Sequence, residues 1–220
     1  LLLVTSTSKK HKDFSKGIAI GSILHTDKNS HLEPVRYGEG SGFFRMLTIP
    51  MVYSKSLLIR FFGIFGIFLK YPLKMFKTIF TKNYAKRTTV LLFMQTLDST
   101  LQLKLGKITK MKSKTEDGKK PSAFISEALK LGKQFGKQVN GIPYANFTDV
   151  LLGSPTTAHI LGGSVMAATP EKGVIDKNNN VFGYKNMLVC DGSAISANPG
   201  VNPSLTITAI TEHAMSKIAA

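Results

Sequence analysis

Two spacings of apolar residues recur along this chain, and each predicts a different kind of element. Residues 122–139 ("SAFISEALKLGKQFGKQV") place apolar side chains at the i, i+3, i+4 interval behind a serine, which predicts an amphipathic helix. Residues 16–25 and 30–37 are short β-rich runs on either side of the turn "TDKN", which predicts a pair of strands. The chain is therefore expected to combine helices and strands.

A second strand pair is predicted further along. Apolar and polar residues alternate on both sides of Asp98 and Ser99, in residues 88–98 ("TTVLLFMQTLD") and 99–112 ("STLQLKLGKITKMK"). This pattern predicts a hairpin. Residues 116–121 ("EDGKKP") are charged and end in proline, so a solvated loop is expected there.

The last third of the chain has a different character, because glycine, proline, asparagine and small side chains dominate from Ile142 onward. Residues 186–190 ("NMLVC") predict an apolar strand that ends in Asp191, Gly192 and Ser193. An acidic residue in that place indicates a ligand-binding site, since open α/β folds bind ligands at the carboxyl ends of their strands.

The closing helix is predicted to begin at "NPS", with Asn202 as its N-cap and Pro203 at its first position. The free amides of such a first turn favour an anion or a developing negative charge. Asn-Pro is also ordinary helix-starting chemistry, so the residues alone leave both interpretations open.

A basic and apolar block separates these regions. Residues 46–97 contain no Asp or Glu, whereas eight lysines and arginines punctuate a run of Phe, Ile and Leu, with Pro50 and Pro72 expected to bound helical pieces. The run at 57–69 is too short to cross a bilayer and has Arg60 inside it. Two interpretations remain open: a segment lying in a membrane interface, or a helical hairpin that covers the protein's own core.

Composition narrows the classes of function. A net charge of +16 on 220 residues suggests an anionic partner, and an apolar content of 43% excludes a globally disordered chain. We expect no nucleic acid as partner, because no recognition motif accompanies the charge.

The single cysteine, Cys190, fits a reducing compartment and is expected to be structural, so the protein is placed in the cytoplasm or peripherally on a membrane. No metal-ligand spacing joins the five histidines; those near the start, His31 included, are expected in polar loops or at strand edges, and no metal is predicted.

Three motifs of the last third occur in an order that resembles a known family. They are "HILGG" at 159–163, "VFGYKNMLVCDGSAIS" at 181–196 and "GVNPSLTITAI" at 200–210. Together they resemble the C-terminal signature of the glucose-methanol-choline (GMC) flavoprotein oxidoreductases, in particular the cholesterol oxidase branch. Residues 17–45 resemble the start of the same branch's substrate domain.

This resemblance implies an α/β fold in two parts. Residues 1–157 would form an α+β substrate-binding domain with an antiparallel sheet and a basic apolar insertion at about 46–88. Residues 158–220 would complete the FAD-binding domain. The family's dinucleotide fingerprint G-x-G-x-x-G is absent, since "GIFGIF" has the wrong spacing. We therefore expect this chain to be the C-terminal part of a longer protein, to need the N-terminal FAD-binding part as its partner, and to be inactive alone.

The resemblance also implies the chemistry, which is hydride transfer from the CH–OH group of a lipophilic, sterol-like alcohol to FAD. His159 matches the family's catalytic histidine, which positions the alcohol oxygen and acts as base. Asn202 matches the asparagine beside flavin and substrate, and the helix opened by Asn202 and Pro203 would direct its positive end at the flavin. Asp191 and Gly192 match the residues that meet the ribityl and phosphate region of the cofactor.

Glu33, in "HLEPVRY", falls where the cholesterol oxidase branch carries an active-site carboxylate. From the residues alone it is equally well a solvated strand residue or a partner for Arg36. The sequence departs from the branch at Ile160, where proline is usual, and this change is expected to loosen the turn without removing the imidazole of His159. The alternative function is a non-catalytic peripheral membrane or lipid-binding module, which has no reason to hold these motifs in this order.

Overall fold

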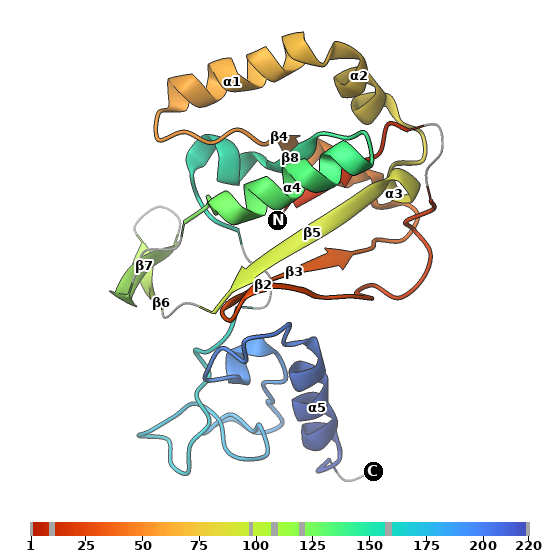
Figure 1. Cartoon of the computed structure of the whole chain (residues 1–220). Helices are drawn as coiled ribbons and strands as arrows, with labels where there is room; N and C mark the ends of the chain where they lie inside the picture. The colour runs from red at the N-terminus through yellow and green to blue at the C-terminus, as the bar shows by residue number, and fades with distance from the viewer. Residues whose placement is uncertain are drawn as a thin grey trace. The chain divides into compact units, whose positions relative to one another are not determined.

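The chain forms two compact units, Leu1–Thr156 and Thr157–Ala220, which are described separately (Figure 1). Figure 1 shows the computed structural model. It describes residues 2–8, 12–96, 99–106, 110–118, 122–156 and 160–218.

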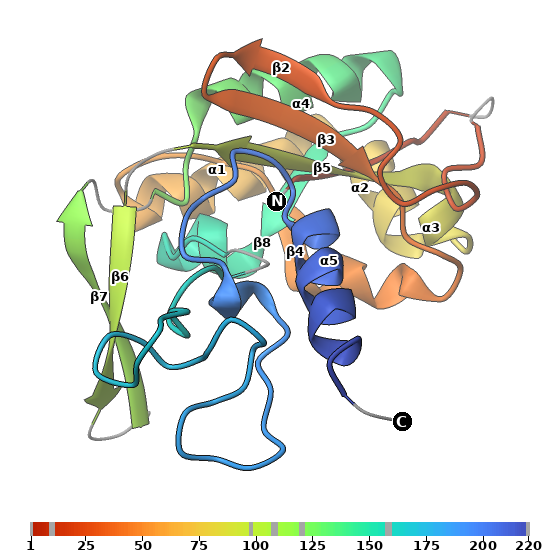
Figure 2. The same cartoon turned by 90° about the horizontal axis from the view of Figure 1, so that it is seen from below.

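A six-stranded antiparallel sheet is the centre of the first unit (Figures 1 and 2). Its order is β2-β3-β5-β1-β8-β4. The strands are β1 (Leu2–Thr5), β2 (Leu24–Asp27), β3 (Ser30–Val35), β4 (Thr48–Pro50), β5 (Thr88–Gln95) and β8 (Pro143–Asn146). Strands β1 and β5 lie inside the sheet because their Leu, Val and Thr runs are buried on both faces. The predicted α/β class with an antiparallel sheet is confirmed.

Helix α4 (Ser126–Gln138) covers one face of the sheet, where Leu2, Val4 and Leu91 pack with Ala128. Gly132, one turn beyond Ala128, keeps the helix close to the strand, since a Cβ there would lie 3.1 Å from Leu2 Cδ1. The amphipathic helix predicted over 122–139 is present, but it begins at Ser126 rather than at Ser122. Its small residues set how closely it packs.

Helix α2 (Pro72–Phe80) covers part of the opposite face, and helix α1 (Leu57–Lys70) packs against the clusters of both faces, through Ile64 and Ile67. Met75 packs there against Leu3 and Val90, and the hydroxyl of Tyr144 donates to Met75 Sδ at 3.0 Å. Burial raises the pKa of Tyr144 to about 12, which keeps this hydroxyl protonated at neutral pH. Pro72 occupies the first turn of α2, as expected for a proline at the start of a helix.

The short elements of this unit connect the larger ones. They are the 3₁₀ helix η1 (Ser41–Leu47), the helix α3 (Tyr84–Arg87) and a single π-helical turn η2 (Thr148–Leu152).

Two strand predictions need correction. The strand pair of β2 and β3 exists, but its first strand starts at Leu24 rather than at residue 16. The hairpin predicted from 88–98 and 99–112 is wrong, because β5 pairs with β1 and β3 in the sheet. The hairpin joins β6 (Ser99–Gly106) to β7 (Lys110–Gly118), so residues 116–118 of the predicted loop belong to a strand. The continuous apolar run of β5 suits a buried position, whereas the Leu and Lys alternation of β6 suits a two-sided ribbon.

The second unit consists mostly of turns around a small core. Ile175, Val181 and Ala194 are buried together, and Val189 packs against them. The elements are the 3₁₀ turn η3 (Gly192–Ala194) and the helix α5 (Ser204–Met215). The strand predicted at 186–190 is wrong: one bridge, Asn180 with Leu188, takes its place. A ladder needs neighbouring strands, and the described part of this unit, 160–218, contains none.

Candidate active site

The turn at Asp191 is held by its own side chain. Asp191 Oδ1 accepts from the Ser193 amide at 2.8 Å and from the Ser193 hydroxyl at 2.5 Å. The hydroxyl and then the amide of Ser193 lower the pKa of Asp191, so the carboxylate stays ionised. The same turn begins the short helix η3, which makes Asp191 a local capping residue.

Glycine is required in this turn because another segment passes close by. A Cβ on Gly192 would lie 2.8 Å from the carbonyl oxygen of Ile160. The Gly162 amide donates to the Gly192 carbonyl at 3.2 Å, and the Ser164 amide to the Ser193 carbonyl at 3.0 Å. Residues 160–163, the described part of the "HILGG" motif, therefore lie beside the "DGS" motif.

Gly162 and Gly163 both have positive φ angles, +77° and +107°. Nothing lies within 4 Å of the point where a Cβ on Gly163 would be, so its backbone is open on that side. A pair of glycines in this state lets a planar ligand approach the main chain. His159, the predicted catalytic histidine, lies outside the described residues, so its position relative to Asn202 stays a prediction.

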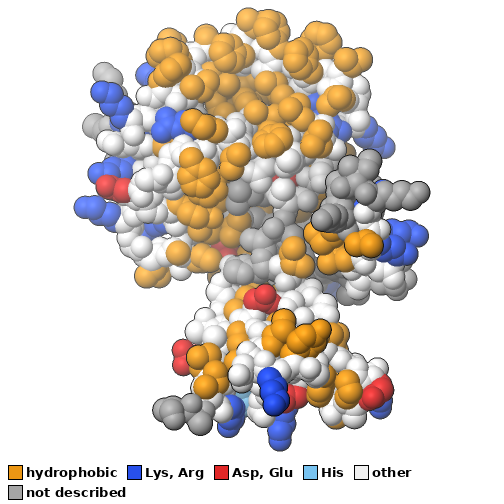
Figure 3. All heavy atoms as spheres, turned by 180° about the vertical axis from the view of Figure 1, so that it is seen from behind, with side chains coloured by type: hydrophobic (Ala, Val, Ile, Leu, Met, Phe, Trp, Pro, Cys, Tyr) orange, Lys and Arg blue, Asp and Glu red, His pale blue; other side chains and the backbone are white. Residues whose placement is uncertain are grey.

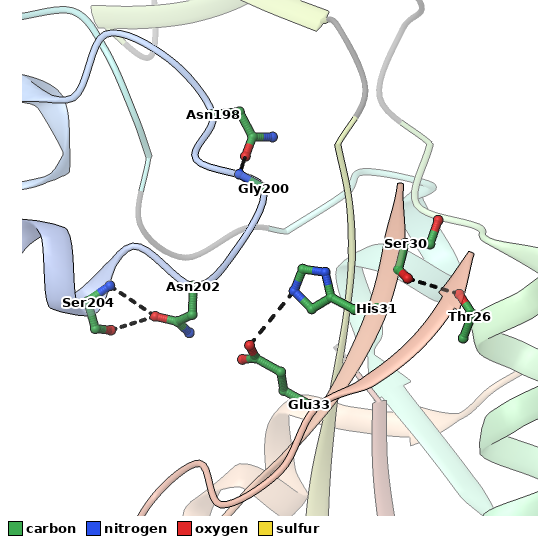
Figure 4. A network of polar contacts seen from close by, with 8 residues as sticks. All are labelled: Thr26, Ser30, His31, Glu33, Asn198, Gly200, Asn202 and Ser204. Carbon is green, nitrogen blue, oxygen red and sulfur yellow. Dashed lines mark hydrogen bonds and ion pairs between the residues drawn. The ribbon is translucent and has the colours of Figure 1, made fainter. Parts of the chain in front are cut away.

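Asn202 organises the start of α5 (Figure 4). Its Oδ1 accepts from the Ser204 amide at 3.1 Å and from the Ser204 hydroxyl at 2.6 Å. The helix begins at Ser204, one residue later than predicted, and buried Pro203 precedes it rather than filling its first position. Pro203 takes the N-cap position, so the prediction of Asn202 as N-cap is wrong; the Asn202 side chain instead forms a local turn with Ser204, two residues on.

Helix α5 is tied to the segment that leads to Asp191. The hydroxyl of Thr211 donates to the carbonyl of the half-buried Cys190 at 2.9 Å. The glycine pair, the Asp191 turn and α5 are thus joined by hydrogen bonds within one unit.

Glu33 lies in the first unit, on β3. Its side chain is 5% exposed, so the solvated strand residue considered from the sequence is excluded. Arg36, the other partner considered, donates to the carbonyl of Lys16 at 2.6 Å. Glu33 stands opposite Leu92 in the ladder, on the sheet face that also carries Val90.

His31 is the residue that the sequence analysis missed. It was expected in a polar loop or at a strand edge, but it is buried, with its Nε2 3.8 Å from Glu33 Oε1 (Figure 4). Residues i and i+2 of a strand share a face, so the pattern His-x-Glu inside a β-rich run was the available signal. His25, exposed on β2, stands opposite His31 with ring centroids 5.9 Å apart.

Comparison with known proteins adds to this geometry. Residues 109–211 match the family model described as GMC oxidoreductase. A cholesterol oxidase of Acinetobacter baumannii is 37% identical over 219 residues, which cover 96% of this chain and 38% of that protein. A cholesterol oxidase of Mycobacterium tuberculosis is 34% identical over 213 residues, 93% of this chain and 36% of that protein. The chain belongs to the GMC oxidoreductase family.

The similarity to these GMC oxidoreductases extends over nearly the whole chain, and the chain spans little more than a third of the length of either relative. A shorter match, 37% identity over 62 residues or 28% of this chain, links it to the long-chain-alcohol oxidase FAO4B of Arabidopsis thaliana. As predicted, the resemblance is to a C-terminal part of such proteins.

Backbone groups of the second unit of this GMC oxidoreductase chain could hold part of a cofactor. The open backbone at Gly163 leaves room for a ring, and the start of α5 offers amides to negative charge. Asp191, Gly192, Asn202 and Pro203, the residues expected at the cofactor, belong to the same hydrogen-bonded unit. Contact of each with FAD stays a prediction.

The first unit also contains a hollow of about 590 Å³ that lies apart from Glu33. Tyr53, Arg60, Phe124 and Asp149 are among its lining residues. Burial raises the pKa of Asp149, whose Oδ1 accepts from the amide and the hydroxyl of Thr156. Among the described residues, no group of three or more His, Cys, Asp or Glu side chains could hold a metal ion.

Proposed function

We propose that this chain is the substrate-binding and C-terminal part of an FAD-dependent oxidoreductase that oxidises a lipophilic, sterol-like alcohol. The observation that carries the proposal is the hydrogen-bonded unit made of the Gly162–Gly163 pair, the Asp191 turn and the start of α5. When bound, FAD would supply the acceptor for the hydride that leaves the CH–OH carbon.

Three residues of this chain would manage the proton and the charge. His159 would take the proton of the substrate hydroxyl, because an imidazole is a suitable base near neutral pH. Asn202 would lie beside the flavin and the substrate, and the start of α5 would stabilise the negative charge that develops on the flavin as it receives the hydride. Glu33, buried beside His31, would serve as a second acid–base group on the substrate side.

The test uses the complete gene product that contains this chain. Bound flavin is read from its absorption at roughly 450 nm, and candidate alcohols are tested for their ability to bleach it. We expect His159→Ala to retain flavin and to slow its reduction by about 10²-fold or more. His213→Ala, on α5, is the matched control and should reduce flavin at the normal rate.

The outcomes separate this proposal from its alternative. A complete protein that carries no flavin would leave the non-catalytic lipid-binding module as the better explanation. If the flavin of His159→Ala is reduced by the alcohol at the unchanged rate, His159 takes no part in the reaction, but the proposal of an oxidoreductase stands.

A further inference from the structure

Helices α1 and α2 present a large apolar surface to solvent. Helix α1 has no buried residue, and only its inner side, through Ile64 and Ile67, packs against the sheet. Figure 3 shows hydrophobic side chains gathered over these helices. The residues that form the surface are more than 40% exposed: Leu57, Leu58, Ile59, Phe61, Phe62, Phe65, Phe68, Leu69, Leu73, Phe76, Ile79 and Phe80. Apolar patches of this extent are typical of binding surfaces.

The one charged residue inside α1 is turned away from this surface. Arg60 Nε donates to the Ser54 carbonyl at 2.6 Å, and its Nη1 donates to the carbonyl of Val150 at 2.8 Å. The guanidinium is thereby committed to backbone oxygens of the protein. The outer side of α1 therefore presents apolar side chains as far as Lys70.

The other arginines are used in the same way. Arg45 donates to the carbonyls of Ile79 and Thr81 at the end of α2, both at 3.0 Å, and Arg87 donates to the carbonyl of Ser8. The other cations near these helices are lysines, of which Lys70 and Lys74 lie over the Tyr71 ring, each 5.5 Å from its centroid. Lys55, Lys70, Lys77 and Lys82 are exposed and Lys74 is half-buried, and all of them lie on or beside the two helices.

The charge pattern determines which partner fits. Residues 46–97 hold no acidic side chain, so the partner must offer both apolar volume and negative charge. A second copy of the same surface would bring lysines against lysines. An anionic bilayer offers both properties, since acyl chains accept Phe and Leu while phosphate and carboxylate headgroups attract lysines.

Length decides how the helices would meet the bilayer. Within the described ranges, no helix is long and apolar enough to cross a membrane. Helix α1 has 14 residues, which corresponds to about 21 Å against a hydrocarbon core of about 30 Å. Two short helices with lysines at their ends suit a position along the interface.

We propose that the α1–α2 surface docks this protein on anionic lipid bilayers, with the Phe and Leu side chains in the acyl boundary and the lysines at the headgroups. The two interpretations that the sequence left open, a membrane-interface segment and a helical hairpin over the core, then both apply to α1 and α2. Their inner side covers the protein's own core and their outer side faces lipid.

The test measures co-sedimentation of the complete gene product with vesicles of phosphatidylcholine, alone or mixed with phosphatidylserine, at low and high salt. Binding should require the anionic lipid and weaken with salt. Replacing Lys70, Lys74 and Lys77 together by Gln should weaken binding on the order of tenfold to a hundredfold. Lys130, Lys133 and Lys137, three exposed lysines of α4, provide the matched control when replaced by Gln.

A second variant tests the apolar part. Phe62→Ser combined with Phe65→Ser should abolish sedimentation, whereas Leu103→Ser with Leu105→Ser, on β6 where these side chains are 64% and 92% exposed, should not. Equal losses in both lysine sets would overturn the proposal in favour of general charge attraction. Failure of the unmodified protein to bind vesicles would overturn it too. Light scattering would then distinguish a dimer that the Phe variant disrupts from a monomer, in which the rest of the protein would be what covers the surface.

Discussion

At the scale of single residues, Glu33 and His31 illustrate how a strand can pair two titratable groups. They are two positions apart on β3, share a face, and are each 5% exposed. Removal from water makes an interaction between carboxylate and imidazole stronger than on the surface. The pair is therefore expected to act as one unit in the proposed reaction.

A double-mutant cycle tests this unit. We expect Glu33→Gln to slow flavin reduction by about 10²-fold. His31→Gln should slow it less, and the double variant should be no slower than Glu33→Gln alone, because residues that act together are not additive. His25→Gln, exposed on β2, is the control. Additive effects in stopped-flow measurements would show that His31 acts independently of Glu33.

Asp191 gives a prediction about pH. Its pKa in the folded protein is lowered, so its stabilising contribution is fully present above the pKa of the unfolded chain and is lost as pH falls through the folded value. Wild-type protein should therefore lose stability more steeply than Asp191→Asn as pH falls from about 5 to about 2. Urea unfolding at several pH values measures the difference, which is expected to stay below about 1 kcal/mol because the carboxylate is exposed. Parallel stability curves would contradict the assignment.

At the scale of elements, α4 depends on a narrow approach to the sheet. Gly132→Leu should lower the free energy of unfolding by about 1–3 kcal/mol, since the added atoms would overlap Leu2. Gly66→Leu on α1 makes the same change where nothing lies within 4 Å of the added Cβ, and should not destabilise the protein. Chemical denaturation of both variants checks the contrast. Equal effects would mean that the packing of α4 is looser than the structure indicates.

The elements also show what the sequence can and cannot predict. Helix α4 was predicted because its apolar spacing is a local feature, although it begins at Ser126 and not at Ser122. Helix α5 was predicted from the Asn-Pro pair that directly precedes it. The partner of β5 was mispredicted, because strand pairing depends on contacts distant along the chain, here with β1 and β3. Residues 186–190 have strand composition, but composition cannot supply the neighbouring strands that a ladder requires.

The candidate site was predictable to a similar degree. Motifs that lie within a few residues of one another, such as Asp191 with Ser193 or Asn202 with Ser204, were visible in the sequence. The approach of Ile160 to Gly192 and the burial of His31 come from the folded chain, so they could not be read from composition.

At the scale of the whole molecule, the two units differ in how much core they contain. The first unit has a six-stranded sheet with buried clusters on both faces, whereas the second rests on Ile175, Val181 and Ala194. Small cores provide little stability without further support. The second unit is therefore expected to depend on the FAD-binding part that we propose for the complete protein.

Hydrogen exchange tests this dependence. In the 220-residue chain alone, amides of residues 160–218 should exchange faster than those of β1 and β5, because local opening costs less free energy there. In the complete protein with flavin, their exchange should slow. Slow exchange of both units in the chain alone would show that the second unit is independently stable.

The inward turn of Arg60 has a practical consequence for anyone handling the protein. Because the guanidinium is held by carbonyls of Ser54 and Val150, the outer side of α1 is left apolar. Mild detergent should therefore bind this surface, in the place that we assign to lipid. Yield and apparent mass during purification should therefore follow detergent concentration more closely than they follow temperature.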